Sequence, residues 1–249
     1  NGATANLNRV FIGEQNSGHL TVQNGASLTT TSNVNMTNNG GLVNNGVMNV
    51  NGGLSASSTS SVRIGSGGTF NGNLTANHTS SLSTNGTLTG NLTNHSSVLQ
   101  NIGVNGKING DARVTNGDQL RIAGEISGGL FNVNGNGSVV IESTATILSE
   151  GENSWIYNTA DITWEVGADG SVGTLRTNRN ESAAGAFDGE WRYDTSTLLT
   201  VVLDAYDPAV YGETISLELL SNIQNPNAFG QNVKFMLNGQ DVTPDFIYR

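Results

Sequence analysis

The sequence predicts an all-β chain that begins with a β-solenoid and continues into an antiparallel, β-rich C-terminal region. One observation is the stretch from Ile102 to Ile126, where apolar residues recur every six positions between Gly, Asn, Asp and Thr. Another is the composition, which combines 33 Gly and 35 Asn with only 3 Pro and no Cys. The last is a change near residue 150, because every Trp and Tyr lies beyond it.

A period of six residues separates the solenoid from the common alternatives. The members in this stretch are Ile102, Ile108, Val114, Leu120 and Ile126. A helix needs apolar residues at i, i+3, i+4 and i+7, and a hairpin sheet needs alternation broken by tight turns. A six-residue step fits a short strand and a corner, with one aliphatic side chain pointing inward. Three steps then make a triangular coil of about eighteen residues, and coils stack at about 4.8 Å.

The same six-residue period occurs upstream with interruptions. It predicts a solenoid of about eight coils over residues 1–150. Its earlier members are Met36, Leu42, Met48, Leu54, Ile64, Phe70, Leu82, Leu88, Leu92 and Val98. Gly and Asn tolerate the positive φ that corners need, and stacked Asn side chains can form ladders between coils. Disorder is the other interpretation of such a composition, but the regular apolar positions and the scarcity of Pro and charge argue against it.

Residues 151–249 form the second predicted region. Turn signals such as Asp169-Gly170 and Asn238-Gly239 separate longer alternating segments. The expected strands are Asp161 to Val166, Gly189 to Tyr193, Thr197 to Asp204, Thr214 to Leu220 and Val233 to Leu237. We expect them to pair antiparallel, either as a compact sandwich or as a cap over the last coil, since an open end is an unpaired strand edge.

Two parts of the sequence resemble bacterial secreted β-solenoids such as autotransporter passengers and PEP-CTERM-type surface proteins. Near the N-terminus, the steps VFIG (10–13), SGHLTV (17–22) and NGASL (24–28) resemble their repeats. The segments 198–206, 212–217 and 245–248 resemble the end of such proteins. The resemblance implies a right-handed, non-catalytic β-helix that is secreted to a surface or matrix. The stretch 102–126 also resembles the cytoplasmic bactofilins in its period, but the low Lys content and the large second region fit that family poorly.

Charge and composition exclude several function classes. Residues 1–110 have a net charge of +2 and residues 111–249 a net charge of −12, without a basic stripe that could bind nucleic acid. No run of 18 apolar residues is present, so we expect no membrane span. Lys107 and Lys234 are the only lysines, and a Lys-poor surface rich in Asn, Thr and Gly indicates an extracellular or cell-surface location.

The sequence offers no recognisable catalytic or metal motif, so we expect no enzyme and no cofactor. His19, His78 and His95 lie in polar steps without metal-ligand spacing, although His78 and His95 are about one coil apart. A glycan-cleaving groove needs paired acids and aromatic residues, yet residues 1–110 contain only Glu14 and neither Trp nor Tyr. Calcium is the alternative in the second region, where the acids Asp161, Glu165, Asp169, Asp188, Glu190 and Asp194 lie, but no known calcium-loop spacing occurs.

The predicted function is therefore structural. We expect a non-catalytic subunit of a bacterial surface or matrix filament, in which molecules self-associate head to tail through their β-edges into a homopolymer. The candidate assembly residues are Asn1, Leu7, Val10 and Ile12 at the uncapped start and Phe246, Ile247 and Tyr248 in the closing segment. The alternatives are an adhesin passenger that binds extracellular glycans or surfaces and, third, a β-helix enzyme that acts on polysaccharides.

Overall fold

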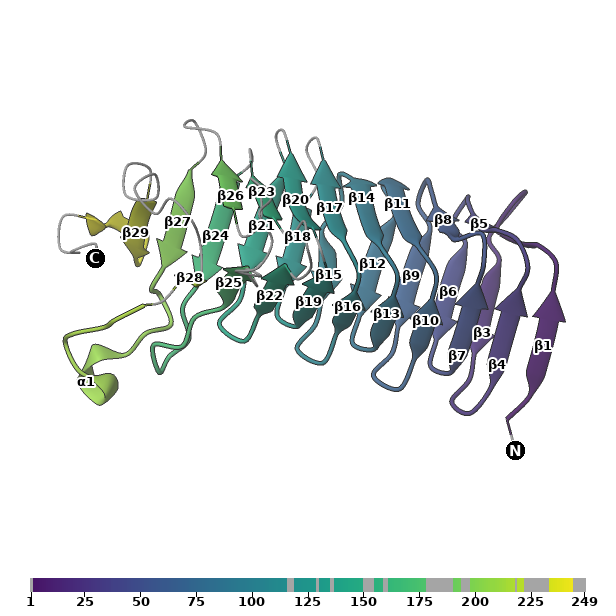
Figure 1. Ribbon diagram of the computed structural model, residues 1–249, viewed down its shortest axis with the longest axis horizontal. Coiled ribbons are helices and arrows are strands. Elements are labelled where there is room, and N and C mark those ends of the chain that lie inside the picture. Colours follow the sequence, from purple (N-terminus) through teal and green to yellow (C-terminus); the bar gives the residue numbers. More distant parts are fainter. Residues whose placement is uncertain are drawn as a thin grey trace, which may run out of the picture.

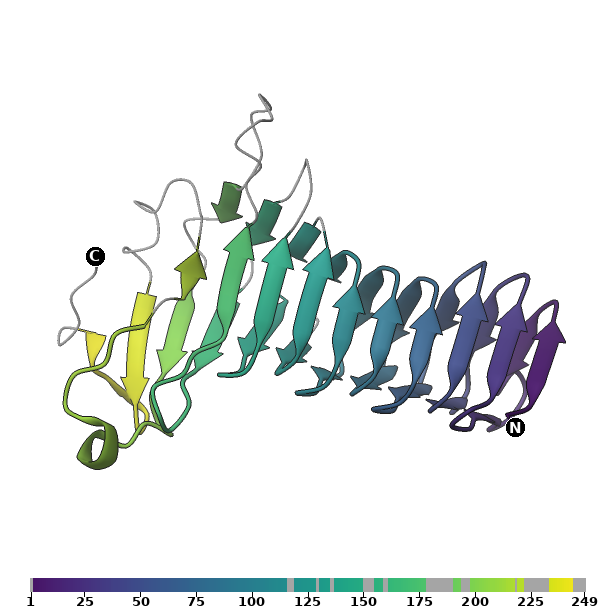
Figure 2. The ribbon, with the colours of Figure 1, turned by 60° about the horizontal axis from the view of Figure 1, so that its bottom comes forward.

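The chain winds into an elongated β-solenoid, with the first coil at one end of the rod and the last described strands at the other (Figures 1 and 2). The computed structural model describes residues 2–115, 119–128, 130–134, 137–149, 155–158, 161–177, 190–193, 198–217, 219–221 and 233–243. Within these residues α1 (Pro208–Tyr211) is the only α-helix, and the other regular elements are almost all strands. The predicted all-β solenoid is thus confirmed.

Three sheets form the walls of the solenoid, and each sheet takes every third strand. Sheet A contains β1 (Thr4–Leu7), β4 (Ser27–Thr30), β7 (Val47–Val50), β10 (Thr69–Asn71), β13 (Thr87–Thr89), β16 (Lys107–Asn109), β19 (Glu125–Gly128), β22 (Thr146–Ser149), β25 (Thr174–Thr177) and β28 (Leu220–Ser221). Sheet B contains β2 (Val10–Ile12), β5 (Val34–Met36), β8 (Leu54–Ala56), β11 (Leu74–His78), β14 (Leu92–Ser96), β17 (Ala112–Thr115), β20 (Leu130–Asn134), β23 (Trp155–Asn158) and β26 (Glu190–Tyr193). Sheet C contains β3 (His19–Val22), β6 (Gly41–Asn44), β9 (Ser61–Ile64), β12 (Ser81–Thr84), β15 (Gln100–Ile102), β18 (Gln119–Ile122), β21 (Ser138–Ile141), β24 (Asp161–Glu165), β27 (Leu199–Val202), β29 (Val233–Leu237) and β30 (Gln240–Asp241).

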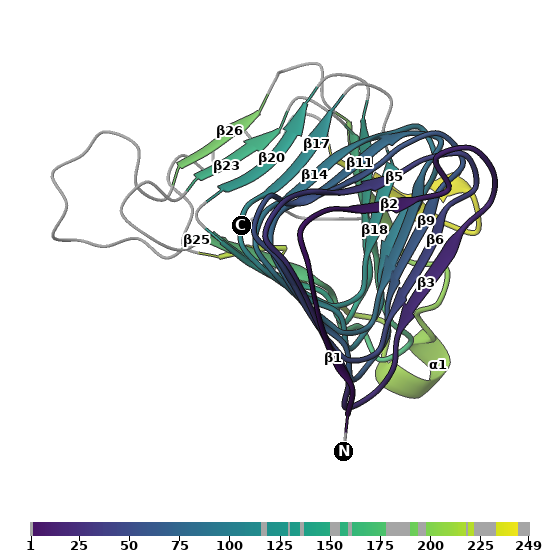
Figure 3. The ribbon, with the colours of Figure 1, turned by 90° about the vertical axis from the view of Figure 1, so that its right-hand side faces the viewer.

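The coil is triangular and right-handed. In Figure 3, seen from the N-terminal end, the chain passes clockwise from β1 through β2 to β3 while it recedes from the viewer. Coil length varies around the predicted eighteen residues. Thr69 pairs with Thr87, a coil of 18 residues, whereas Thr4 pairs with Ser27, a coil of 23 residues. The additional residues lie in the corners, where they leave the strands undisturbed.

The six-residue period marks the inward-facing side chains as predicted. Ile102, Ile108, Val114 and Leu120 are each 0% exposed, and Ile126 is 1% exposed. They belong to one apolar core that continues from the first coils to the last, so each coil buries its side chains only against its neighbours. The predicted ladders of polar side chains between neighbouring coils also form. On the outer side of sheet A, Asn71 Nδ2 donates to Asn49 Oδ1 at 2.7 Å.

Glycine sets the corner between sheets C and A because another chain segment passes directly against it. A Cβ on Gly86 would lie 2.2 Å from the Gly65 carbonyl oxygen, and one on Gly124 would lie 2.2 Å from the Gly106 carbonyl oxygen. Gly46, Gly68 and Gly106 occupy the same corner in other coils and have similarly close backbone neighbours. The high glycine content therefore serves close backbone stacking as well as turns.

Val98 is the exception to the period. Its side chain is 37% exposed and that of the adjacent Leu99 is 46% exposed, because both lie in the corner between β14 and β15. Gln100, in register with Leu120, takes the inward position instead and is 0% exposed. The prediction of Val98 as a core residue was therefore wrong, and the polar residue Gln100 takes a core position in its place.

The strands after residue 150 correct the expected pairing direction. From β23 to β29, every strand pairs in parallel with the preceding strand of its own sheet, and antiparallel pairing within the described residues is confined to β29 and β30. The inward column also runs on, since Trp164 is 0% exposed between Ile141 and Val201. Alternation of apolar and polar residues is the same in parallel and antiparallel strands, so the sequence pattern could not distinguish them.

The positions of these later strands agree with the sequence prediction better than their pairing direction does. The expected strands near 161, 189, 197 and 233 correspond to β24, β26, β27 and β29, whereas only Leu220 of the expected strand 214–220 lies in β28. Asp207 caps α1, and its Oδ1 accepts a hydrogen bond from Ala209 N at 3.0 Å. The division of the chain into domains at residue 150 stays a prediction.

Candidate assembly surfaces

Among the described residues, the first coil presents three strand edges. β1, β2 and β3 each pair with the second coil, and none of them pairs with another described strand on its other side. All four residues of β1 are exposed. Unpaired parallel edges with their backbone groups in the strand plane are a ready template for another strand.

Apolar side chains at this end are also uncovered. Leu7 is 45% exposed and Phe11 is 48% exposed, while Val10 and Leu20 are half-buried. Leu7 and Val10 were predicted as assembly residues from the sequence, whereas Phe11 was not. Ile12 lies deeper, at 4% exposure. The Arg9 side chain lies over the Phe11 ring, and its guanidinium carbon is 5.4 Å from the ring centroid.

The backbone alternation identifies which residues face the open side. The carbonyl oxygens of Ala3 and Leu7 accept hydrogen bonds from the second coil at 2.8 and 3.1 Å. Thr4 and Asn6 alternate with them in β1, so their N–H and C=O groups point away from the second coil. Thr21 holds the corresponding position in β3, because Val22 O is used by the second coil. These residues can therefore be altered without removing a bond inside the solenoid.

The opposite end differs between the three sheets. Sheets A and B end at β28 and β26, but in sheet C the short strand β30 folds back on β29. Val242 N donates to Phe235 O at 2.8 Å, and Thr243 Oγ1 accepts from Phe235 N at 3.0 Å. This turn covers the edge of β29. The predicted assembly residues Asn1, Phe246, Ile247 and Tyr248 lie outside the described residues.

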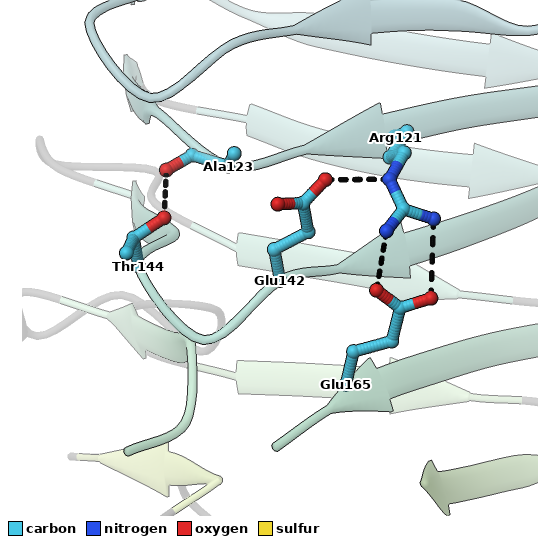
Figure 4. A network of polar contacts seen from close by, with 5 residues as sticks. All are labelled: Arg121, Ala123, Glu142, Thr144 and Glu165. Carbon is cyan, nitrogen blue, oxygen red and sulfur yellow. Dashed lines mark hydrogen bonds and ion pairs between the residues drawn. The ribbon is translucent and has the colours of Figure 1, made fainter. Parts of the chain in front are cut away.

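An ion-pair network crosses sheet C on its outer side (Figure 4). Arg121 on β18 donates to Glu142 and makes two parallel bonds to Glu165, of which Nη1 to Oε1 measures 3.1 Å. The hydrogen bond to Glu165 is the main cause that raises the pKa of Arg121 above its usual value. Partial burial acts in the opposite direction, and the hydrogen bond to Glu142 adds to the increase. The network joins three consecutive coils, and sequence analysis missed it although 121, 142 and 165 are spaced by about one coil.

The histidines and acids considered as metal ligands are not brought together within the described residues. Asn77 aligns with His95 and His78 with Ser96, so His78 and His95 are one residue out of register. Asp161 accepts from Leu198 N at 3.0 Å, and Asp169 accepts from Ser171 N at 3.0 Å, so each of these two acids bonds to a backbone N–H group. No group of three potential ligands occurs within the described part of the chain, which leaves out Asp188, Asp194 and the Glu190 side chain.

Sheet A has an uncharged outer side over its first strands. The outward residues of β1, β4, β7, β10 and β13 are Thr4, Asn6, Ser27, Thr29, Val47, Asn49, Thr69, Asn71, Thr87 and Thr89. Asn49 Nδ2 donates to Thr29 Oγ1 at 3.3 Å, which extends the ladder from Asn71 over three coils. Charged residues first appear on this side at Lys107 and Glu125, which pair at 2.8 Å.

Neither membrane spanning nor relationship to other proteins adds to this picture. The described helix is too short to cross a membrane. Comparisons with family models, curated proteins and solved structures found no match.

Proposed function

We propose that this protein is a non-catalytic structural rod of a bacterial surface or matrix, whose molecules join head to tail through the open first coil. The carrying observation is the combination of three unpaired strand edges with exposed Leu7 and Phe11 at one end. Another solenoid end fits this surface best, because its parallel strand edges around an apolar core can continue the same sheets.

The other end limits how the joint forms. Since β30 covers β29, the joint uses sheets A and B, with β28 and β26 of one molecule beside β1 and β2 of the next. Charge favours this polarity. Two acidic ends repel, whereas residues 1–110 carry +2 against −12 for residues 111–249. A contact between unlike surfaces does not close on itself, so it propagates into a filament.

The resemblance to secreted solenoid repeat proteins and the Lys-poor composition support an extracellular or cell-surface location. A rod of stacked coils fits such a role because its backbone ladders run along its length.

The experiment compares wild type with a Thr4→Pro/Asn6→Pro/Thr21→Pro variant by light scattering over a range of concentrations. Proline removes an N–H and blocks an edge, and these three N–H groups face the open side. We expect wild type to grow with concentration and the variant to stay monomeric with its circular dichroism unchanged. A Thr4→Ser/Asn6→Thr/Thr21→Ser control keeps the N–H groups and should assemble. A monomeric wild type, or a dimer that does not grow, contradicts head-to-tail assembly.

The second candidate function is an adhesin that presents the side of the solenoid to extracellular glycans. The uncharged outer side of sheet A favours it, because its hydroxyl and amide groups can hydrogen-bond sugar hydroxyls. A Thr69→Lys/Thr87→Lys variant should lose binding on a glycan array, while a Ser83→Lys variant on sheet C should keep it. Absence of binding by the wild-type protein contradicts this function.

A further inference from the structure

One column of paired residues runs through sheet C from the first coil to the last parallel strand. It begins at Val22 in β3 and ends at Phe235 in β29, with one residue in each coil between them. Those residues are Asn44, Ile64, Thr84, Ile102, Ile122, Ile141, Trp164 and Val201. A second molecule that continued sheet C as a further coil would therefore place its Val22 against Phe235 of the first.

The backbone of this column follows one bonding rule. From Val22 to Ile122, the carbonyl oxygen of each member accepts a hydrogen bond from the residue that follows its partner in the next coil. Val22 O, for example, accepts from Asn45 N at 2.8 Å. For Phe235, the same parallel pattern assigns the carbonyl oxygen to Gln23 N and the N–H to Thr21 O of the next molecule.

Residues 242 and 243 of the same chain occupy both of these Phe235 groups. Val242 N donates to Phe235 O at 2.8 Å, and Phe235 N donates to Thr243 Oγ1 at 3.0 Å. The Thr243 hydroxyl donates in turn to Asp241 Oδ1 at 2.5 Å, which orients it. The turn therefore offers Phe235 one donor and one acceptor, as a neighbouring parallel strand would.

The turn is held to the strand by a small contact. β30 pairs with β29 at two positions, whereas β27 pairs with β29 at four. Both residues of β30 are exposed, and Val242 is only partly buried against the core. Elements with few buried contacts open at a lower free-energy cost than core strands, so a longer strand that offers the same groups can displace this turn.

β3 of a second copy is such a strand. Its inward residues Leu20 and Val22 would lie against Val233 and Phe235, which are 5% and 6% exposed. The two inward columns of sheet C would then continue across the joint without a change of register. The outward residues of β3 already present their backbone groups on the open side, where no described strand pairs with them.

We propose that residues 240–243 form an internal cap, which covers the edge of β29 in one molecule until β3 of a second copy displaces it. The inference rests on the head-to-tail joint proposed above and extends it, because an opened cap lets sheet C continue across the joint together with sheets A and B. While the molecule is alone, the cap keeps an edge strand from pairing with unrelated chains.

The test is disulfide cross-linking between two copies, since the chain contains no cysteine of its own. One copy carries Thr21→Cys and the other Lys234→Cys, at outward positions that the joint places opposite each other. Paired strands lie about 4.8 Å apart, within the Cα separation that a disulfide spans. Peptide mass analysis should detect the mixed disulfide. A Thr163→Cys copy, whose site lies between two paired strands, should form none with Thr21→Cys.

A further variant tests the turn itself. Thr243→Val removes the hydroxyl that accepts from Phe235 N, so it should speed the mixed disulfide about fivefold, the factor that one typical hydrogen bond contributes. Thr163→Val, the same change inside the sheet, should leave the rate unchanged, with circular dichroism showing that both variants are folded. An unchanged rate in Thr243→Val, or filaments without the mixed disulfide, overturns the cap and leaves the joint through sheets A and B. Absence of growth in light scattering overturns the joint and the cap together.

Discussion

The core column makes a quantitative prediction at Ile108. Its side chain is 0% exposed and lies in register between Leu88 and Ile126 of the neighbouring coils. Ile108→Ala removes three carbon groups at about 0.8 kcal/mol each, or about 2.4 kcal/mol of transfer free energy. The backbone ladders hold both neighbours in place, so the cavity closes poorly and the expected loss of unfolding free energy is about 3–4 kcal/mol.

The assay is urea unfolding followed by circular dichroism, with Val104→Ala as the matched control. Val104 is four residues away and 60% exposed, so its truncation should change the unfolding free energy by less than about 0.5 kcal/mol. Because each coil is stable only against its neighbours, the loss should move the unfolding midpoint of the coils around β16. If Ile108→Ala unfolds like Val104→Ala, the inward column has been misassigned and the reasoning fails.

Three further predictions concern the corners and the charges. Gly86→Ala should lower the unfolding free energy by about 1–3 kcal/mol or more, since the new Cβ would lie 2.2 Å from a backbone oxygen. Gly67→Ala is the control in the same unfolding assay and should be tolerated, because the nearest atom to its Cβ would be 3.7 Å away. Arg121→Met should cost about 1 kcal/mol at low salt and less at high salt, because its side chain is 32% exposed, and a salt-independent loss would show that packing dominates. The hydroxyl and then the N–H of Ser171 hold the pKa of Asp169 below its usual value, so this turn adds stability above the ordinary Asp pKa and loses it as pH falls through the lowered one; an NMR titration should show a higher Asp169 pKa in Ser171→Ala.

Several features of the fold were predictable because they depend on local chemistry. Inward aliphatic residues at a fixed period specify a core line, and Ile108 and Leu120 lie on it at 0% exposure. Residues 1–8 carry neither charge nor Pro, and all four residues of β1 are exposed in the structure; the role of Leu7 in assembly stays a prediction.

Other features depended on which segments meet, and only the tertiary structure decided them. The Arg121 network and the hydrogen bond from Gln100 to Ser80 join residues about 20 positions apart, and their spacing in the sequence was a signal that became readable only once coil lengths were known.

The sequence by itself determined the β-solenoid, its inward period and the glycine content that its corners use. The tertiary structure decided that the strands beyond residue 150 continue the parallel ladders, because alternation such as that around Trp164 suits either direction of pairing. It also decided that the corner at Val98 turns outward and brings Gln100 into the core. The physical reason is the same in both cases: side-chain periodicity fixes which face is buried, while the partner and register of a strand follow from backbone pairing between segments distant in the chain.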